Sequence, residues 1–427
     1  MAISSISESR TSAIPADSNL GRQASEQRAP LKVFLMDLWA VVPYYDAYLC
    51  RALLAQNVLV TLASITYYLD PQCFSARGLR NRPGLLDIVG KFQLPKLLRR
   101  PLKFTEAMLN LLGSAVRMLY ARPDVLHVQF LPLLRWRVPL ETWFLFYCKR
   151  LGIKMVYTVH DLLPHDTAQR HWRRFHRLYQ SSDALICHSE SAKRQLVDDF
   201  RIPSERIWII PHGPLFYDCA APFREHIRSK YSAEPGECLV LWQGLIFPYK
   251  GIDFLLDSWV KVQRAGGKAR LVVAGTGSAE LLSALVRKAE SLGISASVTF
   301  DFRFLPLEEL TSLYSAVDMV VYPYKAVTTS GALLTGVALG KPIIATNLKA
   351  FAEILEHGEN ALLVEPGDTQ ALAGSILRLA SEPEFRLQLG ARAKQLGSGD
   401  DAWRSIAKQT RECYLSVLAD KIHSRAE

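Results

Sequence analysis

The sequence predicts an α/β protein built from two doubly wound parallel sheets that face each other across a cleft. Apolar runs of strand length alternate with helical stretches along nearly the whole chain. Most of these runs are continuous rather than alternating with polar residues, as expected for parallel strands that helices cover on both faces. With 427 residues, the chain is too long for one ordinary core, so more than one domain is predicted.

Twelve apolar segments are predicted to be strands, six in each half of the chain. The first six are Leu31–Asp37, Val58–Ile65, Asp124–Gln129, Ile153–Val159, Asp183–His188 and Arg206–Ile210. The second six are Cys238–Gln243, Ala269–Ala274, Ala296–Phe300, Val317–Tyr322, Lys341–Ala345 and Asn360–Val364. Amphipathic helices are predicted between them, for example Gly251–Arg264, Ala279–Leu292 and Leu307–Ala316. Strand and helix alternation on this scale predicts doubly wound sheets.

Two turn-rich segments place the domain boundary near residues 212–237. His212, Gly213 and Pro214 follow the sixth strand, and Glu234, Pro235 and Gly236 precede the seventh. The predicted domains are residues 31–215 and 236–400, and a final helical stretch, 401–427, is expected to pack back on the first domain. Residues 1–30 are rich in Ser, Ala and Arg and lack an apolar core, so they predict a disordered leader and no signal peptide.

Composition narrows the class of protein. A hydrophobic fraction of 49% with 22% charged residues is typical of a globular enzyme. No run reaches the roughly 18 apolar residues of a membrane-spanning helix. The seven cysteines are scattered and form no CxxC pair, so we expect reduced thiols in the cytoplasm and no metal site built from them.

The net charge of +10 is concentrated between residues 91 and 150. Eleven basic residues in this stretch are opposed by Glu106, Asp124 and Glu141, and they are interleaved with Leu, Phe and Trp. This pattern suits an anionic membrane surface, where each cation near the headgroups gains about 1 kcal/mol. A solvated basic face over an ordinary core is the alternative. Nucleic-acid binding is not expected, because no recognised motif accompanies the charge.

A strand, a small-residue turn and a helix start predict an anion site in the second half. Thr328, Thr329, Ser330 and Gly331 follow the apolar strand that ends near Pro323, and they open a short helix running to Gly340. The first N–H groups of a helix lack internal partners and carry partial positive charge, so they bind phosphate well. Ordinary helix capping by Ser330 is the alternative.

Other turns of the second half fit the same chemistry. Gly244 ends one strand and would let backbone approach a ligand, and Lys250 follows just before a helix as a point charge for phosphate. A second strand runs into Gly275, Thr276 and Gly277, a GxG that is weak evidence alone.

The order of these signals resembles the donor-binding domain of the GT-B glycosyltransferases, particularly family 4 (group 1). The order is Gly244 to Lys250, Gly275 to Gly277, Asp318 in its strand, Ser330 and Gly331 before a helix, and Gly340-Lys341-Pro342. First-domain matches are Tyr157 to Asp161, His188-Ser189-Glu190 and Ile210 to Gly213, so the resemblance covers residues 31 to about 395.

The resemblance implies two Rossmann-like domains and a nucleoside-diphosphate sugar, UDP- or GDP-linked, as donor. Residues 31–215 would bind the acceptor and residues 236–400 the donor. Lys250 would hold the diphosphate, with Gly244 permitting its approach. The donor-binding candidates are Gly244, Lys250, Arg303, Phe304, Leu305, Thr329, Ser330, Gly331 and Glu353. Arg303 to Leu305 would lie near the base. No cofactor and no metal are expected.

Two departures from the family pattern bear on the donor sugar and the ribose. Family 4 usually carries two glutamates eight residues apart, and the matching positions here hold Val327 and Thr335. The basic residue that commonly follows the first glycine is replaced by Leu245. A Thr-Ser-Gly version of this loop resembles a subgroup that acts in surface-polysaccharide assembly, some of whose members are β-mannosyltransferases.

The catalytic candidates are His160 and Asp161, which follow the strand Ile153–Val159. An inverting transfer needs a general base, for which Asp161 is preferred. A retaining transfer needs none if the departing diphosphate takes the proton, so both mechanisms stay open. His160 could instead be structural, and Asp161 could cap a turn. Tyr44, Asp46 and His212 are acceptor-side candidates, although loop polarity explains Tyr44 and Asp46 equally well.

The predicted function is transfer of a sugar to a lipid-linked saccharide in surface polysaccharide or glycolipid assembly. The protein is expected in the cytoplasm, peripheral on the inner face of the membrane through residues 91–150. A non-catalytic GT-B relative that serves as a binding or scaffold subunit is the alternative, because both glutamates are missing.

Overall fold

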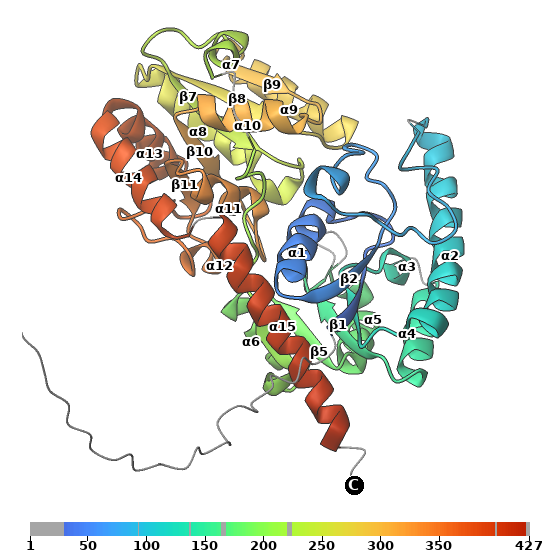
Figure 1. Ribbon diagram of the computed structural model, residues 1–427. Helices are drawn as coiled ribbons and strands as arrows, with labels where there is room; N and C mark the ends of the chain where they lie inside the picture. The colour runs from blue at the N-terminus through green and yellow to red at the C-terminus, as the bar shows by residue number, and fades with distance from the viewer. Residues whose placement is uncertain are drawn as a thin grey trace, which may run out of the picture.

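The computed structural model describes residues 30–92, 94–135, 138–163, 168–219, 224–397 and 399–423. The predicted leader lies outside the described residues except for Pro30, as do Trp136 and Arg137 of the basic stretch. The described part forms two α/β domains side by side, which Figure 1 shows in blue to green and in yellow to orange.

All twelve predicted strands form, within a few residues of their predicted bounds. In the N-terminal domain they are β1 (Leu31–Met36), β2 (Val58–Ala63), β3 (Val125–Val128), β4 (Lys154–Thr158), β5 (Ala184–Cys187) and β6 (Ile207–Ile209). In the C-terminal domain they are β7 (Cys238–Gln243), β8 (Ala269–Ala274), β9 (Val298–Asp301), β10 (Met319–Tyr322), β11 (Ile343–Thr346) and β12 (Leu362–Val364). Their continuous apolar character is explained by burial on both faces of each sheet.

Helices connect the strands. The N-terminal domain contains α1 (Pro43–Ala55), α2 (Lys96–Ala121), α3 (Pro132–Arg135), α4 (Leu140–Arg150), α5 (Trp172–Ser181) and α6 (Glu190–Asp198), with short 3₁₀ turns at Ser75–Arg77, Ala168–His171 and Ser204–Arg206. The rest of the chain contains α7 (Arg224–Lys230), the 3₁₀ turn η4 (Pro248–Lys250), α8 (Ile252–Arg264), α9 (Ala279–Ser291), α10 (Leu307–Ala316), α11 (Gly331–Ala338), α12 (Lys349–Ala352), α13 (Thr369–Ser381), α14 (Pro383–Gln395) and α15 (Gly399–His423).

Both sheets are parallel and doubly wound. The strand order is β2-β1-β3-β4-β5-β6 in the first sheet and β12-β11-β10-β7-β8-β9 in the second. In the second sheet β7 lies between β10 and β8, so the chain winds away from it in both directions. A ligand of such a sheet binds outside the carboxyl ends of the strands where the winding reverses, here β7 and β10. The predicted fold class, two Rossmann-like parallel sheets, is confirmed.

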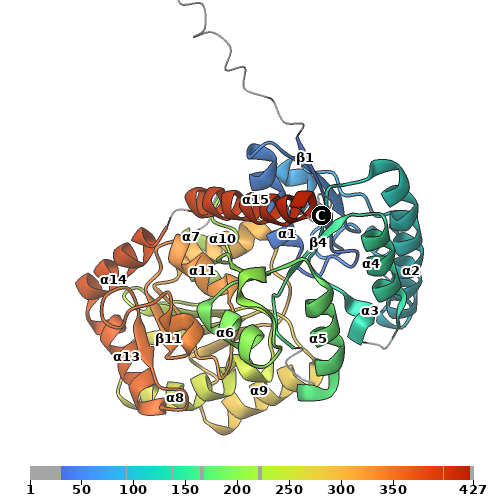
Figure 2. The same cartoon turned by 90° about the horizontal axis from the view of Figure 1, so that it is seen from below.

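The helix α15 returns from the C-terminal domain to the N-terminal domain. Its buried residues Trp403, Ile406 and Tyr414 belong to the core on one face of the first sheet. The indole N–H of Trp403 donates to the carbonyl oxygen of Pro214 at 2.8 Å, in the segment between the domains. Figures 1 and 2 show α15, in red, running alongside α1. The helix thus ties the two domains to each other.

The helix α7, within the predicted linker, packs on the second domain. Ile227 and Tyr231 are buried in its core beside α10. Arg228 of α7 forms an ion pair with Asp318 at 2.9 Å, and Asp318 also accepts from the N–H of Leu239 at the start of β7. None of the helices in the described residues is both long and apolar enough to cross a bilayer.

Candidate active site between the two domains

A cavity of about 350 Å³ lies between the two domains, at the carboxyl ends of β7 and β10. The C-terminal domain contributes the turns after β7, β8 and β9 and the start of α11. The N-terminal domain contributes residues 41–45 and Tyr67, and the linker contributes His212, Leu215 and Phe216. The cavity therefore occupies the place where this sheet topology predicts a ligand.

Glycines hold the backbone turns of this cavity close together. Gly275 has φ of 147°, and a Cβ there would lie 1.8 Å from the carbonyl oxygen of Gly244. Gly251 has φ of 71°, and its Cβ would lie 1.7 Å from the carbonyl oxygen of Pro323. The loops after β7, β8 and β10 can therefore meet only through residues without side chains. Gly244, a donor-binding candidate from the sequence, lines the cavity.

Lys250 supplies an uncompensated positive charge to the cavity. It ends η4, and its ammonium donates to the hydroxyl of Tyr324 at 2.9 Å and lies 4.1 Å from the centre of that ring. Among the described residues it forms no ion pair, whereas the neighbouring Lys325 is paired with Asp253 at 2.6 Å. Hydrogen bonding to Tyr324 and the ring contact fix the ammonium without neutralising it, so it is ready for an anion.

The start of α11 lines the cavity next to Lys250. The hydroxyl of Ser330 caps the helix by accepting from the N–H of Leu333 at 3.2 Å, and it lies 3.4 Å from the hydroxyl of Tyr324. Ser330 thus belongs to the same hydrogen-bonded group as Lys250. Gly331 lines the cavity, and a Cβ there would lie 3.1 Å from Cε1 of His212. The capping that the sequence left open is present, and it leaves the first turn of the helix facing the cavity.

Arg303, Phe304 and Leu305 line the cavity after β9. The guanidinium of Arg303 is paired with Asp301 at 2.7 Å and with Glu309 at 2.8 Å. The bond to Arg303 lowers the pKa of Glu309 to about 2. Because two carboxylates neutralise Arg303, Lys250 is the stronger anion ligand of the two.

A histidine cluster lies on the N-terminal side of the cavity. The ring of Tyr45 contacts His160 at 4.9 Å, His212 at 4.8 Å and His188 at 5.7 Å between ring centres. Nε2 of His160 lies 2.9 Å from Oε1 of Gln129, and its Nδ1 lies 3.4 Å from Nε2 of His188. Burial lowers the pKa of His188 to about 4 and of His212 to about 3. The pKa of His160 is also lowered by burial, so the cluster is neutral near pH 7.

The two catalytic candidates occupy different environments. His160 is buried behind Tyr45 and does not line the cavity, whereas His212 does. Asp161 is half-buried after β4 and also lies outside the cavity lining. His160 is thus held by Gln129, His188 and Tyr45, which is the structural environment that the sequence left as an alternative.

The acceptor-side candidates Tyr44 and Asp46 lie in different environments. Tyr44 lines the cavity and donates its hydroxyl to Asp70 at 2.9 Å. Asp46 is fully buried and faces Asp37 in the interior, so the expectation that it reaches an acceptor is corrected. Burial raises the pKa of both carboxyls; the charge of Asp37 raises the pKa of Asp46 further, whereas the interaction with Asp46 counteracts the rise at Asp37. Asp37 in turn accepts from the N–H of Val42 at 2.9 Å, so the pair shapes the loop that leads into α1.

Glu353 and Thr329 lie on a second cavity of about 370 Å³, behind α11. The carboxylate of Glu353 accepts from the N–H groups of Glu190 and Ser191 at the start of α6, each at 2.9 Å. Glu353 therefore contacts the other domain and does not line the first cavity. A donor contact would be expected on the first cavity.

The two positions that lack the family glutamates are filled from within the protein. The hydroxyl of Thr335 donates to the carbonyl oxygen of Leu215 at 2.7 Å and accepts from the N–H of Leu215 at 3.0 Å. Val327 packs against the core of the C-terminal domain. Thr335 therefore bonds to the linker backbone at the position where the family glutamate would contact a ligand.

Aromatic residues line the cavity more extensively than the sequence indicated. Tyr45, Tyr67 and Phe216 come from three different segments, and Phe216 adopts φ of 62° to place its ring 4.6 Å from that of Tyr44. Tyr44, Tyr45 and Tyr67 each follow the carboxyl end of a strand in sequence, which was a usable signal. No pattern in the sequence indicated that Phe216 would adopt this conformation and line the cavity.

A two-domain fold with a cationic, glycine-walled cavity at the switch point of the second sheet defines a GT-B protein. Two family models match this chain: "Glycosyltransferase Family 4" over residues 45–213 and "Glycosyl transferases group 1" over residues 237–382. Together they account for well over half of the chain. The protein therefore belongs to the group 1, family 4 glycosyltransferases.

Individual relatives agree with this assignment. An uncharacterised glycosyltransferase of Methanocaldococcus jannaschii is 26% identical over 60% of this chain and 66% of its own length. The D-inositol 3-phosphate glycosyltransferase of Rhodococcus erythropolis is 27% identical over 64% of each chain. The chain thus spans less than two thirds of the length of these curated relatives.

Solved structures share the fold at low sequence identity. The Anabaena protein HepE, in complex with UDP and glucose, superposes with a TM-score of 0.69 at 17% identity, over 90% of this chain and 100% of its own. A glycosyltransferase from Rickettsia africae gives 0.69 at 15% identity, over 91% and 98%. The GT-B fold is confirmed by these matches.

Proposed function

We propose that the protein transfers a sugar from a nucleoside diphosphate to a lipid-linked saccharide at a membrane surface. The position of Lys250 is the main support for a nucleoside-diphosphate sugar as the donor. Its ammonium forms no ion pair among the described residues, and it lines the interdomain cavity together with the start of α11. Charge that develops on a departing diphosphate would be stabilised by Lys250 and by the first N–H groups of α11.

The donor is a UDP- or GDP-sugar, with no metal required to hold its diphosphate. The complex of HepE with UDP and glucose supports a nucleotide sugar. Asp161 is the general base in an inverting reaction, while a retaining reaction passes the acceptor proton to the diphosphate. The anomeric configuration of the product distinguishes the two.

The acceptor half is supported by an apolar and basic surface on α2 and α4. Leu112, Val116 and Leu119 are exposed along one face of α2 at helical spacing, and Trp143 of α4 is 63% exposed. Arg100, Arg122 and Arg150 lie in or at the ends of the same two helices. Large exposed apolar side chains with cations suit an anionic bilayer surface.

Some basic residues of the stretch 91–150 do not face outward. Lys103 lies over the ring of Trp39 at 5.3 Å, and burial lowers its pKa. Arg99 lies over the ring of Tyr68 at 4.6 Å. The membrane-facing charge is therefore smaller than the sequence count suggests.

The test is transfer of label from UDP- and GDP-sugars into a membrane lipid extract by the purified protein. Lys250→Ala should abolish transfer, and Lys325→Ala, a neighbouring lysine paired with Asp253, should retain it. Binding of UDP without transfer or donor hydrolysis would reject the proposal in favour of a non-catalytic binding subunit. Equal transfer by the two variants would reject the role of Lys250.

A further inference from the structure

His212 belongs to both of the cavities that α11 borders between the domains. It lines the first cavity together with Lys250, and the second cavity together with Thr329. No other described residue lines both. It follows β6 in the segment that leads from the N-terminal to the C-terminal domain, and it is half-buried. Its ring is therefore placed to contact a ligand between the domains.

The ring of His212 has a defined tautomer. Its Nδ1 lies 2.6 Å from the carbonyl oxygen of Gly213, and because a carbonyl only accepts, Nδ1 carries the hydrogen. Burial, and to a smaller extent the neighbouring His188, lowers the pKa of His212 to about 3, so the ring is neutral near pH 7. The other ring nitrogen, Nε2, therefore carries a lone pair and acts as a hydrogen-bond acceptor.

The lone pair on Nε2 is available to a ligand. Nε2 of His212 forms no hydrogen bond with the described residues, and it is not one of their buried unpartnered polar atoms, so it is accessible. The other two histidines of the cluster have both nitrogens engaged. His188 contacts the carbonyl oxygen of Ile210 and Nδ1 of His160, and His160 also contacts Gln129. Within this described cluster, His212 presents the free acceptor atom.

Nε2 of His212 lies beside the first turn of α11. A Cβ on Gly331, the first residue of that helix, would lie 3.1 Å from Cε1 of His212, which is the ring atom bonded to Nε2. Lys250 and Ser330 both contact the hydroxyl of Tyr324, so they gather at the same end of the helix. The acceptor atom of His212 is therefore adjacent to the place proposed for the diphosphate.

This position suits the attacking hydroxyl of an acceptor. In sugar transfer from a nucleoside diphosphate, the acceptor oxygen forms a bond to the anomeric carbon while the bond from that carbon to the diphosphate oxygen breaks. The hydroxyl must therefore be held close to the diphosphate, in line with the reacting carbon. A neutral imidazole nitrogen can accept a hydrogen bond from this hydroxyl, whereas a cation at the same place would pair with the phosphate.

We propose that Nε2 of His212 accepts a hydrogen bond from the attacking hydroxyl of the acceptor saccharide and orients it toward the anomeric carbon. This assignment rests on the proposed function. It holds for both mechanisms, because the proton of the hydroxyl still passes to Asp161 or to the departing diphosphate. The bond from Nδ1 to Gly213 keeps the ring in the orientation that this contact requires.

The test separates the two nitrogens of the His212 ring. In His212→Asn the amide N–H can still donate to the carbonyl of Gly213, but no atom replaces Nε2. In His212→Gln the longer side chain brings an amide oxygen near the position of Nε2. The initial rate of label transfer from UDP- and GDP-sugars into a membrane lipid extract should fall about tenfold in His212→Asn, as for one lost hydrogen bond, and should recover in His212→Gln. UDP affinity, measured by calorimetry, should stay within about twofold in both variants.

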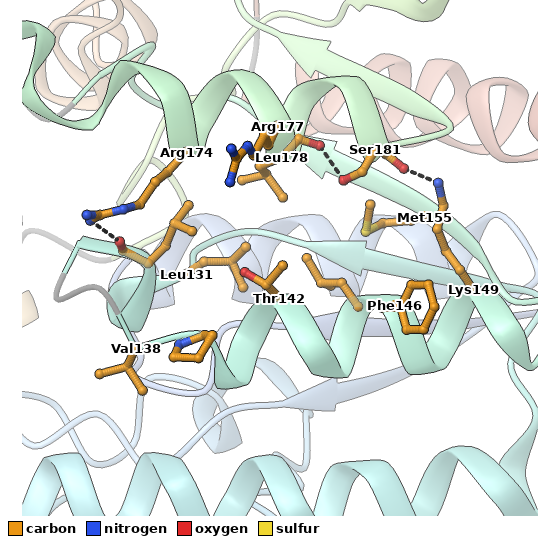
Figure 3. A pocket seen from close by; sticks show the side chains of 13 residues that line it. Leu131, Val138, Thr142, Phe146, Lys149, Met155, Arg174, Arg177, Leu178 and Ser181 are labelled. Atoms are coloured by element: carbon orange, nitrogen blue, oxygen red, sulfur yellow. Dashed lines mark hydrogen bonds between the residues drawn. The ribbon is translucent and has the colours of Figure 1, made fainter.

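Two further variants are matched controls. Thr142→Ala alters a groove between α4 and α5 that shares no described lining residue with either cavity between the domains (Figure 3). His226→Asn makes the same replacement at an exposed histidine of α7 that lines neither cavity. Both should transfer sugar at the wild-type rate.

Transfer by His212→Asn at the wild-type rate would overturn the role of Nε2 while leaving the proposed transfer reaction intact. Equal losses in His212→Asn and His212→Gln, with unchanged melting temperatures, would also overturn it, because an acceptor atom at this position would then make no difference. A tenfold loss of UDP affinity in His212→Asn would assign the residue to the donor instead. Absence of transfer by the wild type would overturn the proposed function and this assignment together.

Discussion

The carboxylate of Glu353 accepts a hydrogen bond from the backbone N–H of Ser191, 2.9 Å away in the other domain. Its second oxygen accepts from the N–H of Glu190 at the same distance. Glu353 therefore acts as an N-terminal anion for α6 although it follows α12 in the other domain. Because these bonds join the two domains, they contribute both to the domain interface and to the stability of α6.

Glu353→Ala should lower the free energy of unfolding by about 1 kcal/mol, the usual cost of losing a helix cap. Denaturant unfolding measures this, with Glu356→Ala as the control, since Glu356 is exposed three residues further on. UDP affinity should stay within about twofold. A large loss of UDP affinity without a change in stability would instead support the donor contact that the sequence predicts.

Lys250→Ala should weaken UDP binding by about 10- to 100-fold, because one charge-assisted hydrogen bond to phosphate is worth about 1.5–3 kcal/mol. Isothermal titration calorimetry is the measurement. Lys325→Ala removes a lysine that is already paired with Asp253, so it should bind UDP as the wild type does. Equal losses in both variants would point to a general effect of charge and not to a phosphate ligand.

Gly275→Ala should destabilise the protein by several kcal/mol and abolish UDP binding. Its Cβ would lie 1.8 Å from the carbonyl oxygen of Gly244, at φ of 147°. Gly374→Ala is the contrasting variant: Gly374 lies within α13, and nothing lies within 4 Å of its Cβ. It should stabilise the protein by about 0.5–1 kcal/mol. Thermal unfolding distinguishes the two, and similar melting temperatures would contradict the close packing of these turns.

Glu141→Gln should change how stability depends on pH. Burial raises the pKa of Glu141 to about 8, against 4.5 for an ordinary glutamate. The folded state therefore keeps a proton that the unfolded state releases, and this contribution is complete below pH 4.5 and is lost as pH rises through about 8. Relative to the wild type, Glu141→Gln should gain stability between about pH 5 and about pH 8, by at most about 1.4 kcal/mol per pH unit.

Denaturant unfolding of both proteins across this range measures the difference. Because the buried histidines are common to both, their opposite trend cancels in the comparison. Glu384→Gln is the control, since Glu384 is also in the first turn of a helix but is exposed. A constant difference between Glu141→Gln and the wild type would show that Glu141 is ionised in the folded state.

The strands and the donor-side turns were predictable because they depend on residues that are adjacent in the sequence. A run such as Cys238–Gln243 is apolar on both faces and ends in a glycine, which is enough to place Gly244 and Lys250 beside the cavity. Asp46 was not predictable, because a carboxylate after a strand has the same local pattern whether it faces solvent or, as here, Asp37 in the interior.

The sequence by itself determined two doubly wound sheets, twelve strands and the cationic turn at Lys250, because hydrophobic pattern, glycine and charge act locally. Only the tertiary structure decided that Thr335 bonds to Leu215 and that Glu353 accepts hydrogen bonds at the start of α6. These relationships join residues far apart in the chain. They depend on how the domains and helices pack, and the free energy of that packing is not carried by any one segment.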